Sequence, residues 1–236
     1  MKTPFVSVII PTYNEEKYIE NALKAIRNQD YNGKYEVIVA DGCSKDKTAK
    51  IAKKYADKII TVSRKGIAVG RNAGANIARG EIFLFIDADT VASFNLITGI
   101  VKCFKNNVVG ATCYIFPLSS SATDLITYWL YNQFVKASIK AKNPQIAGIC
   151  CAYRRSAFEK IGGFNENLKT LEDYDISKRI SKLGKIKISD STFVMTSPRR
   201  IQKWGRTGAA ARYLKMYLNY LLAGKTVGID KYRPIR

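Results

Sequence analysis

The sequence predicts an α/β protein with a doubly wound, mostly parallel sheet. Short apolar runs alternate with segments whose apolar residues recur at helical spacing, as in strands joined by crossover helices. The run at residues 82–86 is apolar throughout, as a strand covered on both faces requires. At 236 residues and 47% hydrophobic composition, the chain is long enough for one sizeable core. We therefore expect one continuous globular body.

Strands and helices alternate regularly through the first half of the chain. Strands are expected at residues 6–10, 36–40, 58–62 and 82–86. Helices are expected between them, over residues 19–26 and 49–55, and a loop followed by a helix is expected within residues 66–78. This order is typical of a parallel nucleotide-binding sheet.

After residue 110 the alternation breaks. The pattern predicts a strand at 111–116, an aromatic-rich helix from about 123 to 139, and a helix at 172–183 after a Gly162-Gly163 turn. Two more strands, 185–188 and 192–195, and a last helix, 207–223, are expected to follow. We interpret this half as a lobe added to the nucleotide-binding half.

The chain contains no histidine. This excludes catalytic triads with a histidine base and every histidine-based metal site, so a general base must be a carboxylate, Lys, Tyr or Cys. The five cysteines show no spacing that suits zinc or a disulfide framework. We expect a reducing, cytosolic setting, and the short apolar run before Pro11 does not suit a signal peptide.

Polar clusters lie where three of the expected strands end, at residues 12–15, 41–44 and 87–89. Ligands of a doubly wound sheet bind beyond the carboxyl ends of its strands, so we expect the clusters to share one edge. The oxygen ligands of Asp87 and Asp89 suit Mg²⁺ or Mn²⁺, which keep coordination positions for substrate phosphates. An acidic turn that hydrates a strand end is the alternative.

Further candidates are Arg71 and the acidic pair Glu172 and Asp173. Arg71 could meet a phosphate or a base edge, and a surface ion pair is its alternative. The pair begins a helix, where acidic residues are common, and an i,i+4 ion pair between Asp175 and Arg179 would be equally ordinary. Without histidine, however, a carboxylate is needed to deprotonate a substrate hydroxyl.

Six short motifs occur in an order typical of one enzyme family. They are VIIPTYNE at 8–15, DGCS at 41–44, RNAG at 71–74, DAD at 87–89, GGFNE at 162–166 and EDYD at 172–175. Each is weak alone, but the ordered series is specific. Over roughly residues 5–190 the chain resembles the glycosyltransferase family 2 enzymes, which have the GT-A fold and transfer a sugar from a nucleotide-diphosphate donor with inversion.

The resemblance implies how the donor is bound. Thr12, Asn14 and Glu15 would line the nucleotide pocket, and Asp41 would contact the base. Arg71 would lie near the base or the phosphates.

The resemblance also implies the metal site and the base. Asp87 would face the ribose and the metal, Mn²⁺ or Mg²⁺, and Asp89 would coordinate the metal. Asp173 would be the catalytic base, with Glu172 supporting it. Residues 1–198 would form the GT-A domain, with a nucleotide-sugar half at about 1–110 and an acceptor and catalytic half at about 111–198.

Two departures from the family pattern affect these expectations. The Gln-x-x-Arg-Trp signature of processive members is absent, since Gln202-Lys203-Trp204 is only loosely similar. We therefore expect the addition of one sugar rather than polymerisation. Asn165 replaces the usual Asp of its loop, while the neighbouring glycines and Glu166 are kept.

Residues 199–236 form a basic tail, with ten Lys or Arg against one Asp in a chain of net charge +20. Such an excess suits an anionic partner, although a merely solvated surface has the same composition. The helix at 207–223 is apolar except for one narrow stripe, as is typical of helices in a membrane interface. With the apolar segment 125–135, it predicts peripheral contact with the cytoplasmic face of the cell membrane and a lipid-linked acceptor. Packing of both segments on the core or on a second subunit is the alternative.

Two other functions remain open at this point. A haloacid-dehalogenase-like phosphatase would place an Asp-x-Asp-x-Thr/Val strand where residues 85–91 stand, although that motif normally lies near the first strand. A nucleic-acid-binding module would fit the charge, but no binding motif accompanies it. We expect no specific nucleic-acid partner.

Overall fold

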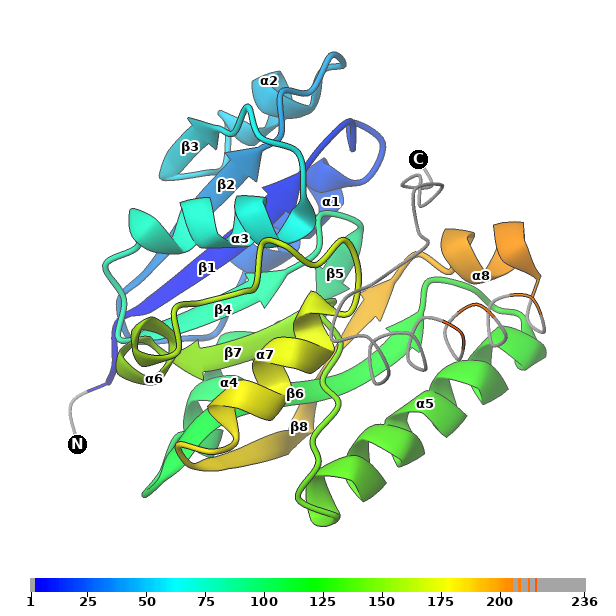
Figure 1. Cartoon of the computed structure of the whole chain (residues 1–236). Coiled ribbons are helices and arrows are strands. Elements are labelled where there is room, and N and C mark those ends of the chain that lie inside the picture. Colours follow the sequence, from blue (N-terminus) through cyan, green and yellow to red (C-terminus); the bar gives the residue numbers. More distant parts are fainter. Residues whose placement is uncertain (1–2, 206–207, 209–211, 213–214, 216–236) are drawn as a thin grey trace.

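The computed structural model describes residues 3–205 and residues 208, 212 and 215. An eight-stranded sheet forms its centre, in the order β3-β2-β1-β4-β7-β6-β8-β5 (Figure 1). The strands are β1 (Val6–Thr12), β2 (Tyr35–Asp41), β3 (Lys58–Thr61), β4 (Ile82–Ile86), β5 (Thr90–Ala92), β6 (Val108–Pro117), β7 (Cys150–Arg154) and β8 (Lys185–Thr196). The helices are α1 (Ile19–Arg27), α2 (Thr48–Ala52), α3 (Ile67–Asn76), α4 (Leu96–Cys103), α5 (Ala122–Lys140), α6 (Arg155–Lys160), α7 (Glu172–Ile180) and α8 (Arg199–Trp204).

The first four strands form a parallel unit. β1 pairs with β2 and β4, and β2 pairs with β3. A helix lies in each connection, because the chain must return to the same end of the sheet before each parallel strand. Beyond them β7 runs antiparallel to β4 and β6, while β6 and β8 are parallel. The predicted mostly parallel sheet is confirmed, and β7 joins its two halves.

Alternate residues of the central strands enter two cores, because successive side chains of a strand point to opposite faces. Val8 and Ile10 of β1 lie in the core that α1 and α4 cover, whereas Ile9 lies in the core that α3, α6 and α7 cover. In the second core Phe85 packs edge-on against Phe164, with ring centroids 5.1 Å apart. Helices on both faces explain why β4 is apolar at every position.

Five elements have no counterpart in the sequence predictions: β5, α4, β7, α6 and α8. β7 is fully central, but its sequence CCAYR holds no β-branched residue and therefore carries a weak strand signal. The prediction of two strands at 185–188 and 192–195 is wrong, since β8 is one strand of 12 residues. It continues because β6 pairs along its length, with a register shift at Cys113 and Tyr114.

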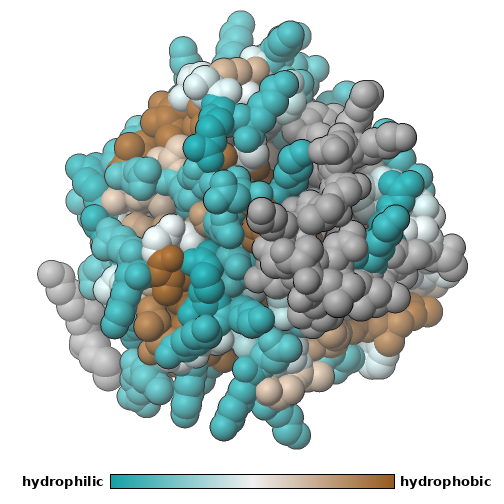
Figure 2. All heavy atoms as spheres, viewed as in Figure 1, coloured by the Kyte–Doolittle hydropathy of each residue, from teal (hydrophilic) through white to brown (hydrophobic). Residues whose placement is uncertain are grey.

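The aromatic-rich helix predicted from 123 to 139 is confirmed as α5. Its inner face packs on β6, where the Asn132 amide donates to the Ile115 carbonyl at 2.8 Å and accepts the Ile115 N–H at 3.1 Å. Its outer face exposes large apolar side chains: Leu125, Ile126, Trp129, Leu130 and Phe134. Figure 2 shows a brown, hydrophobic area at the lower right, where α5 lies in Figure 1.

The basic tail is described only in part. α8 occupies Arg199–Trp204, and the helix predicted at 207–223 lies largely outside the described residues. In the part of the chain that is described, no helix combines the length and apolar character needed to cross a bilayer. The division at residues 110 and 198 remains a prediction.

Candidate active site

The carboxyl ends of β1, β2 and β4 meet at one edge of the sheet. Thr12 and Asp41 are register partners at the ends of β1 and β2, and Asp87 directly follows β4. The loops after β1 and β2 are joined at Ser44, whose hydroxyl accepts the Asn14 N–H at 2.8 Å. Two of the three polar clusters predicted to share this edge are thus in direct contact.

Asp41 shapes the loop that follows β2. Its carboxylate accepts the N–H of Ser44 at 3.0 Å and the hydroxyl of Ser44 at 2.5 Å. Asn14 adopts the left-handed backbone conformation, with φ 53°, and its side chain accepts the Lys45 N–H at 2.8 Å. Thr12 is buried, and its hydroxyl has no hydrogen-bond partner among the described residues. That hydroxyl can therefore serve a bound ligand.

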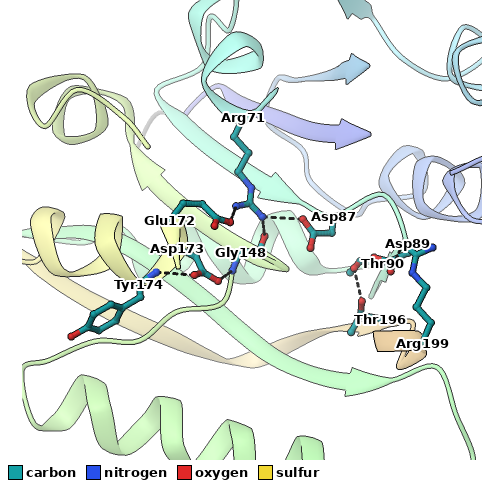
Figure 3. A network of polar contacts seen from close by, with 10 residues as sticks. All are labelled: Arg71, Asp87, Asp89, Thr90, Gly148, Glu172, Asp173, Tyr174, Thr196 and Arg199. Atoms are coloured by element: carbon teal, nitrogen blue, oxygen red, sulfur yellow. Dashed lines mark hydrogen bonds and ion pairs between the residues drawn. The ribbon is translucent and has the colours of Figure 1, made fainter. Parts of the chain in front are cut away.

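A buried arginine joins the end of β4 to the start of α7 (Figure 3). The Arg71 guanidinium donates to Glu172 Oε1 at 2.8 Å and to Asp87 Oδ1 at 3.0 Å. It also donates to the Gly148 carbonyl at 2.9 Å. Arg71 is 1% exposed, so the alternative of a surface ion pair is wrong. Its contact with a donor stays a prediction, because these partners already use much of its donor capacity.

Glu172 and Asp173 begin α7 in different environments. Glu172 is buried against Arg71, whereas Asp173 is partly exposed. The Asp173 carboxylate accepts the Gly148 N–H on Oδ2 and the Tyr174 N–H on Oδ1, each at 2.8 Å. Asp173 is therefore the member of the pair that an incoming hydroxyl can reach, and the backbone fixes its orientation.

Two side chains anchor the loop at residues 161–166 beside this pair. The Asn72 side chain accepts the Phe164 N–H and donates to the Phe164 carbonyl, both at 2.9 Å. Arg179 donates to the Gly163 carbonyl at 2.8 Å and pairs with Asp175 at 2.7 Å. The ion pair expected between Asp175 and Arg179 is thus present, and it helps to hold a loop as well as a helix.

Burial shifts two carboxyl groups of the site toward their neutral forms. Burial and the nearby charge of Asp173 raise the pKa of Glu172 to about 7, and Arg71 opposes only part of that rise. Burial and Asp87 raise the pKa of Asp89 to about 6, against the opposing effect of Arg199. Crowded carboxylates of this kind are stabilised by an added cation.

Arg199, which the sequence marks only as one of many basic residues in the tail, enters the site. Its guanidinium lies 2.7 Å from Glu15 Oε1 and 3.0 Å from Asp89 Oδ2. Arg199 and Glu15 are 184 positions apart, so no local spacing could reveal the contact. Gly148 was missed for the same reason, because only its backbone groups take part.

Asp87 and Asp89 fit a divalent metal that arrives with a phosphate ligand. Within the described residues no cluster of three or more His, Cys, Asp or Glu side chains could hold a metal ion. Mg²⁺, however, is commonly held by one or two carboxylates together with substrate phosphates. The two aspartates provide that donor set, and the protein alone does not complete a cage.

Comparison with known proteins decides the family. Residues 7–162 match the model of Glycosyl transferase family 2. The chain belongs to this family. The predicted resemblance to this family of glycosyltransferases is confirmed.

Curated relatives of this family 2 chain are glycosyltransferases. It is 30% identical over 197 residues to the beta-monoglucosyldiacylglycerol synthase of Nostoc sp. (strain PCC 7120 / SAG 25.82 / UTEX 2576). The matched region covers 75% of this chain and 41% of the synthase. It is 29% identical over 192 residues to glycosyltransferase AglE of Haloferax volcanii, which covers 77% of this chain and 62% of AglE. The chain therefore spans less than two thirds of the length of either relative.

Solved structures share the fold. The mannosyltransferase PcManGT from Pyrobaculum calidifontis, in complex with GDP-Man and Mn²⁺, superposes with a TM-score of 0.70 at 24% identity over 90% of this chain and 64% of that one. TarS 1-349 from S. aureus, in complex with UDP-GlcNAc, gives 0.66 at 24% identity over 83% of this chain and 59% of that one. The predicted GT-A fold of this family 2 chain is confirmed.

The two rival functions are not favoured. Asp87 and Asp89 follow the fourth strand in chain order, whereas the phosphatase motif would be expected near the first. Family membership accounts for the aspartates without a phosphatase and for the fold without a nucleic-acid-binding module.

Proposed function

We propose that this enzyme moves one sugar, with inversion, from a UDP- or GDP-sugar to a hydroxyl or phosphate of an acceptor. The observation that carries the proposal is the arrangement of Asp173, partly exposed and held by two backbone N–H groups, next to the Arg71–Asp87 contact. Structural neighbours with GDP-Man and with UDP-GlcNAc support either nucleotide.

The donor would bind at the shared edge of β1, β2 and β4. Thr12, Asn14 and Glu15 would line its pocket and Asp41 would contact the base, which agrees with the unpaired Thr12 hydroxyl. Asp87 and Asp89 would hold Mn²⁺ or Mg²⁺. When bound, such an ion neutralises charge on the departing diphosphate.

Asp173 would act as the general base. Its carboxylate takes the proton of the acceptor hydroxyl while that oxygen forms a bond to the anomeric carbon and the bond from this carbon to the phosphate oxygen breaks. One displacement inverts the configuration and forms no covalent sugar–enzyme intermediate. Glu172 acts at a distance, because it holds Arg71 in the position that also fixes Asp87.

Addition of a single sugar is proposed because the processive signature is missing. In the segment that is only loosely similar to this signature, the Gln202 side chain contacts α5, where it donates to Asp124 Oδ2 at 3.3 Å. A product of one added residue, seen by mass spectrometry under excess donor, is the expected result.

The proposed acceptor is lipid-linked and is met at the cytoplasmic face of the cell membrane. The outer face of α5 supports this, since Trp129 is 56% exposed and Asp124, the only acidic residue of the helix, is buried. Lys136 and Lys140 on the same helix are exposed and would favour anionic lipid. The Nostoc relative is named for a diacylglycerol product, which agrees with a lipid acceptor.

Flotation of the full chain with vesicles tests the membrane contact. We expect binding to vesicles that contain phosphatidylglycerol, and loss of binding when Trp129→Ser and Leu130→Ser are combined. Gln133→Ser, also exposed on α5, is the matched control and should bind normally. Equal flotation of all three proteins, or none by the unmodified chain, would reject this part of the proposal.

A screen of sugar nucleotides tests the donor. In the presence of Mn²⁺, the donor that raises the melting temperature most identifies the base and sugar, since a ligand that binds only the folded state stabilises it. No stabilisation by any UDP- or GDP-sugar would contradict the proposed donor class.

A further inference from the structure

Pairing between β5 and β8 holds Arg199 in the site. β5 pairs with the end of β8, with Thr90 opposite Thr196. The Ser197 N–H then donates to the Asp89 carbonyl at 3.2 Å. These contacts bring Arg199, two residues further on, beside the carboxylate of Asp89.

The guanidinium is enclosed by groups from two parts of the chain, the segment after β1 and the segment after β4. It pairs with Glu15 at 2.7 Å and with Asp89 at 3.0 Å, and it lies 4.7 Å from the centroid of the Tyr18 ring. Its side chain is 19% exposed. It borders a hollow of about 200 Å³ that is also lined by Asn14, Glu15, Glu16, Lys17, Tyr18 and Asp46.

One donor of this guanidinium is unused. Arg199 Nη1 is buried and has no hydrogen-bond partner among the described residues. A buried N–H group without an acceptor is unfavourable, so a bound acceptor would satisfy it. A planar guanidinium suits a phosphate oxygen, because it can donate two parallel hydrogen bonds.

Arg199 also forms an ion pair with Asp89, the residue that is proposed to bind the metal. A divalent cation at Asp89 would stand beside a guanidinium that already contacts the same carboxylate, and the two positive charges repel. The diphosphate of a donor removes the conflict, because it brings negative charge for both cations.

We propose that Arg199 is a positioning residue. It prevents free metal ions from binding to Asp89, and it allows Asp89 to bind a metal ion that arrives together with a diphosphate. Without donor the guanidinium neutralises Asp89 and Glu15. When the complex binds, the guanidinium leaves Asp89 and donates to diphosphate oxygens, Nη1 included. Metal and donor therefore enter together. The inference rests on the proposed donor site.

Binding of Mn²⁺ alone, followed by electron paramagnetic resonance of the free ion, tests the state without donor. Arg199→Ala should bind Mn²⁺ about tenfold more tightly than the unmodified enzyme, as expected for loss of an unfavourable coupling. Arg199→Lys keeps the charge and should bind Mn²⁺ weakly. The control Lys203→Ala removes the same charge from an exposed position of α8 and should leave Mn²⁺ binding unchanged.

Calorimetric titration of UDP and of GDP at saturating Mn²⁺ tests the state with a bound diphosphate. Arg199→Ala should weaken binding of the nucleotide that the unmodified enzyme prefers, and Arg199→Lys should restore only part of it because it lacks the planar fork. Opposite changes for Mn²⁺ and nucleotide are the signature of the proposal. A merely structural role would weaken both or neither, and either result overturns it.

Failure of the inference can be told from failure of the proposed function. If the unmodified enzyme binds Mn²⁺ with UDP or GDP and Asp89→Ala abolishes this, the donor site stands whatever Arg199 does. If neither nucleotide binds with Mn²⁺, the donor site itself is wrong. Should Arg199→Ala unfold, Arg199→Gln removes the charge at similar size and is measured instead.

Discussion

At the residue scale, Glu172 and Asp173 are neighbours in different environments. Their difference comes from exposure, since Glu172 is buried against Arg71 and Asp173 faces the site with both oxygens oriented by backbone N–H groups. The same buried arginine also reaches Asp87. A substitution of one of these carboxylates should therefore affect the others through Arg71.

Asp173→Asn should lower the rate of transfer by at least about 10²-fold, the range expected for loss of a general base. Donor affinity should change little, because the proposed contact of Asp173 is with the acceptor hydroxyl and not with the nucleotide. Single-turnover kinetics and calorimetry with the chosen donor measure the two effects. The control is Asp190→Asn, an exposed acid whose carboxylate accepts from Tyr114. A near-normal rate for Asp173→Asn would remove its assignment.

Glu172→Gln should change how stability depends on pH. The folded state keeps the Glu172 proton up to a pKa of about 7, while the unfolded chain loses it near the usual value of 4.5. The folded state thus binds the extra proton between these values, so the wild type loses stability as pH rises through them, by at most about 1.4 kcal/mol per pH unit. The variant lacks this loss.

Urea unfolding of both proteins at several pH values measures the difference. The free energy of unfolding of the wild type, minus that of Glu172→Gln, should fall between about pH 5 and pH 7 and be level outside that range. Parallel curves would show that Glu172 is ionised in the folded protein at pH 5.

At the element scale, α5 shows how one helix can serve two surfaces. Tyr128, Asn132 and Val135 face the sheet and are buried, whereas Trp129 and Phe134 face outward. Asn132 fixes the helix to β6 through both backbone groups of Ile115. The inner face is therefore specified by hydrogen bonds as well as by apolar packing.

Asn132→Ala should destabilise the protein by about 1–3 kcal/mol, because it leaves the buried N–H and carbonyl of Ile115 without their partners. The free energy of unfolding in urea measures this effect. Gln133→Ala, on the exposed side of the next position, should change stability by less than about 0.5 kcal/mol. Equal effects of the two changes would contradict the described orientation of α5.

At the scale of the whole molecule, the site is assembled from segments that lie far apart along the chain. Glu15 follows β1, Asp89 follows β4, and Arg199 follows β8, yet all three meet. Donor and metal would bridge these segments. Binding should therefore be linked to global stability and not only to the order of one loop.

Addition of the preferred donor with Mn²⁺ at about 100 times its dissociation constant should stabilise the folded state by about 2.7 kcal/mol. Asp89→Ala should lose most of this gain because the metal loses a ligand. Thermal unfolding with donor alone, Mn²⁺ alone and both together measures the linkage. A gain that is independent of Mn²⁺ and unchanged by Asp89→Ala would show that Asp89 does not bind the metal.

The sequence by itself determined the alternating first half, α5, the family and the strand ends that carry Thr12, Asp41 and Asp87. These features are local, because periodicity and short motifs are properties of adjacent residues. The structure alone revealed the place of β7 between two halves of one sheet, the burial of Arg71 and the entry of Arg199. Each depends on which distant segments pack together, and local spacing carries no record of that.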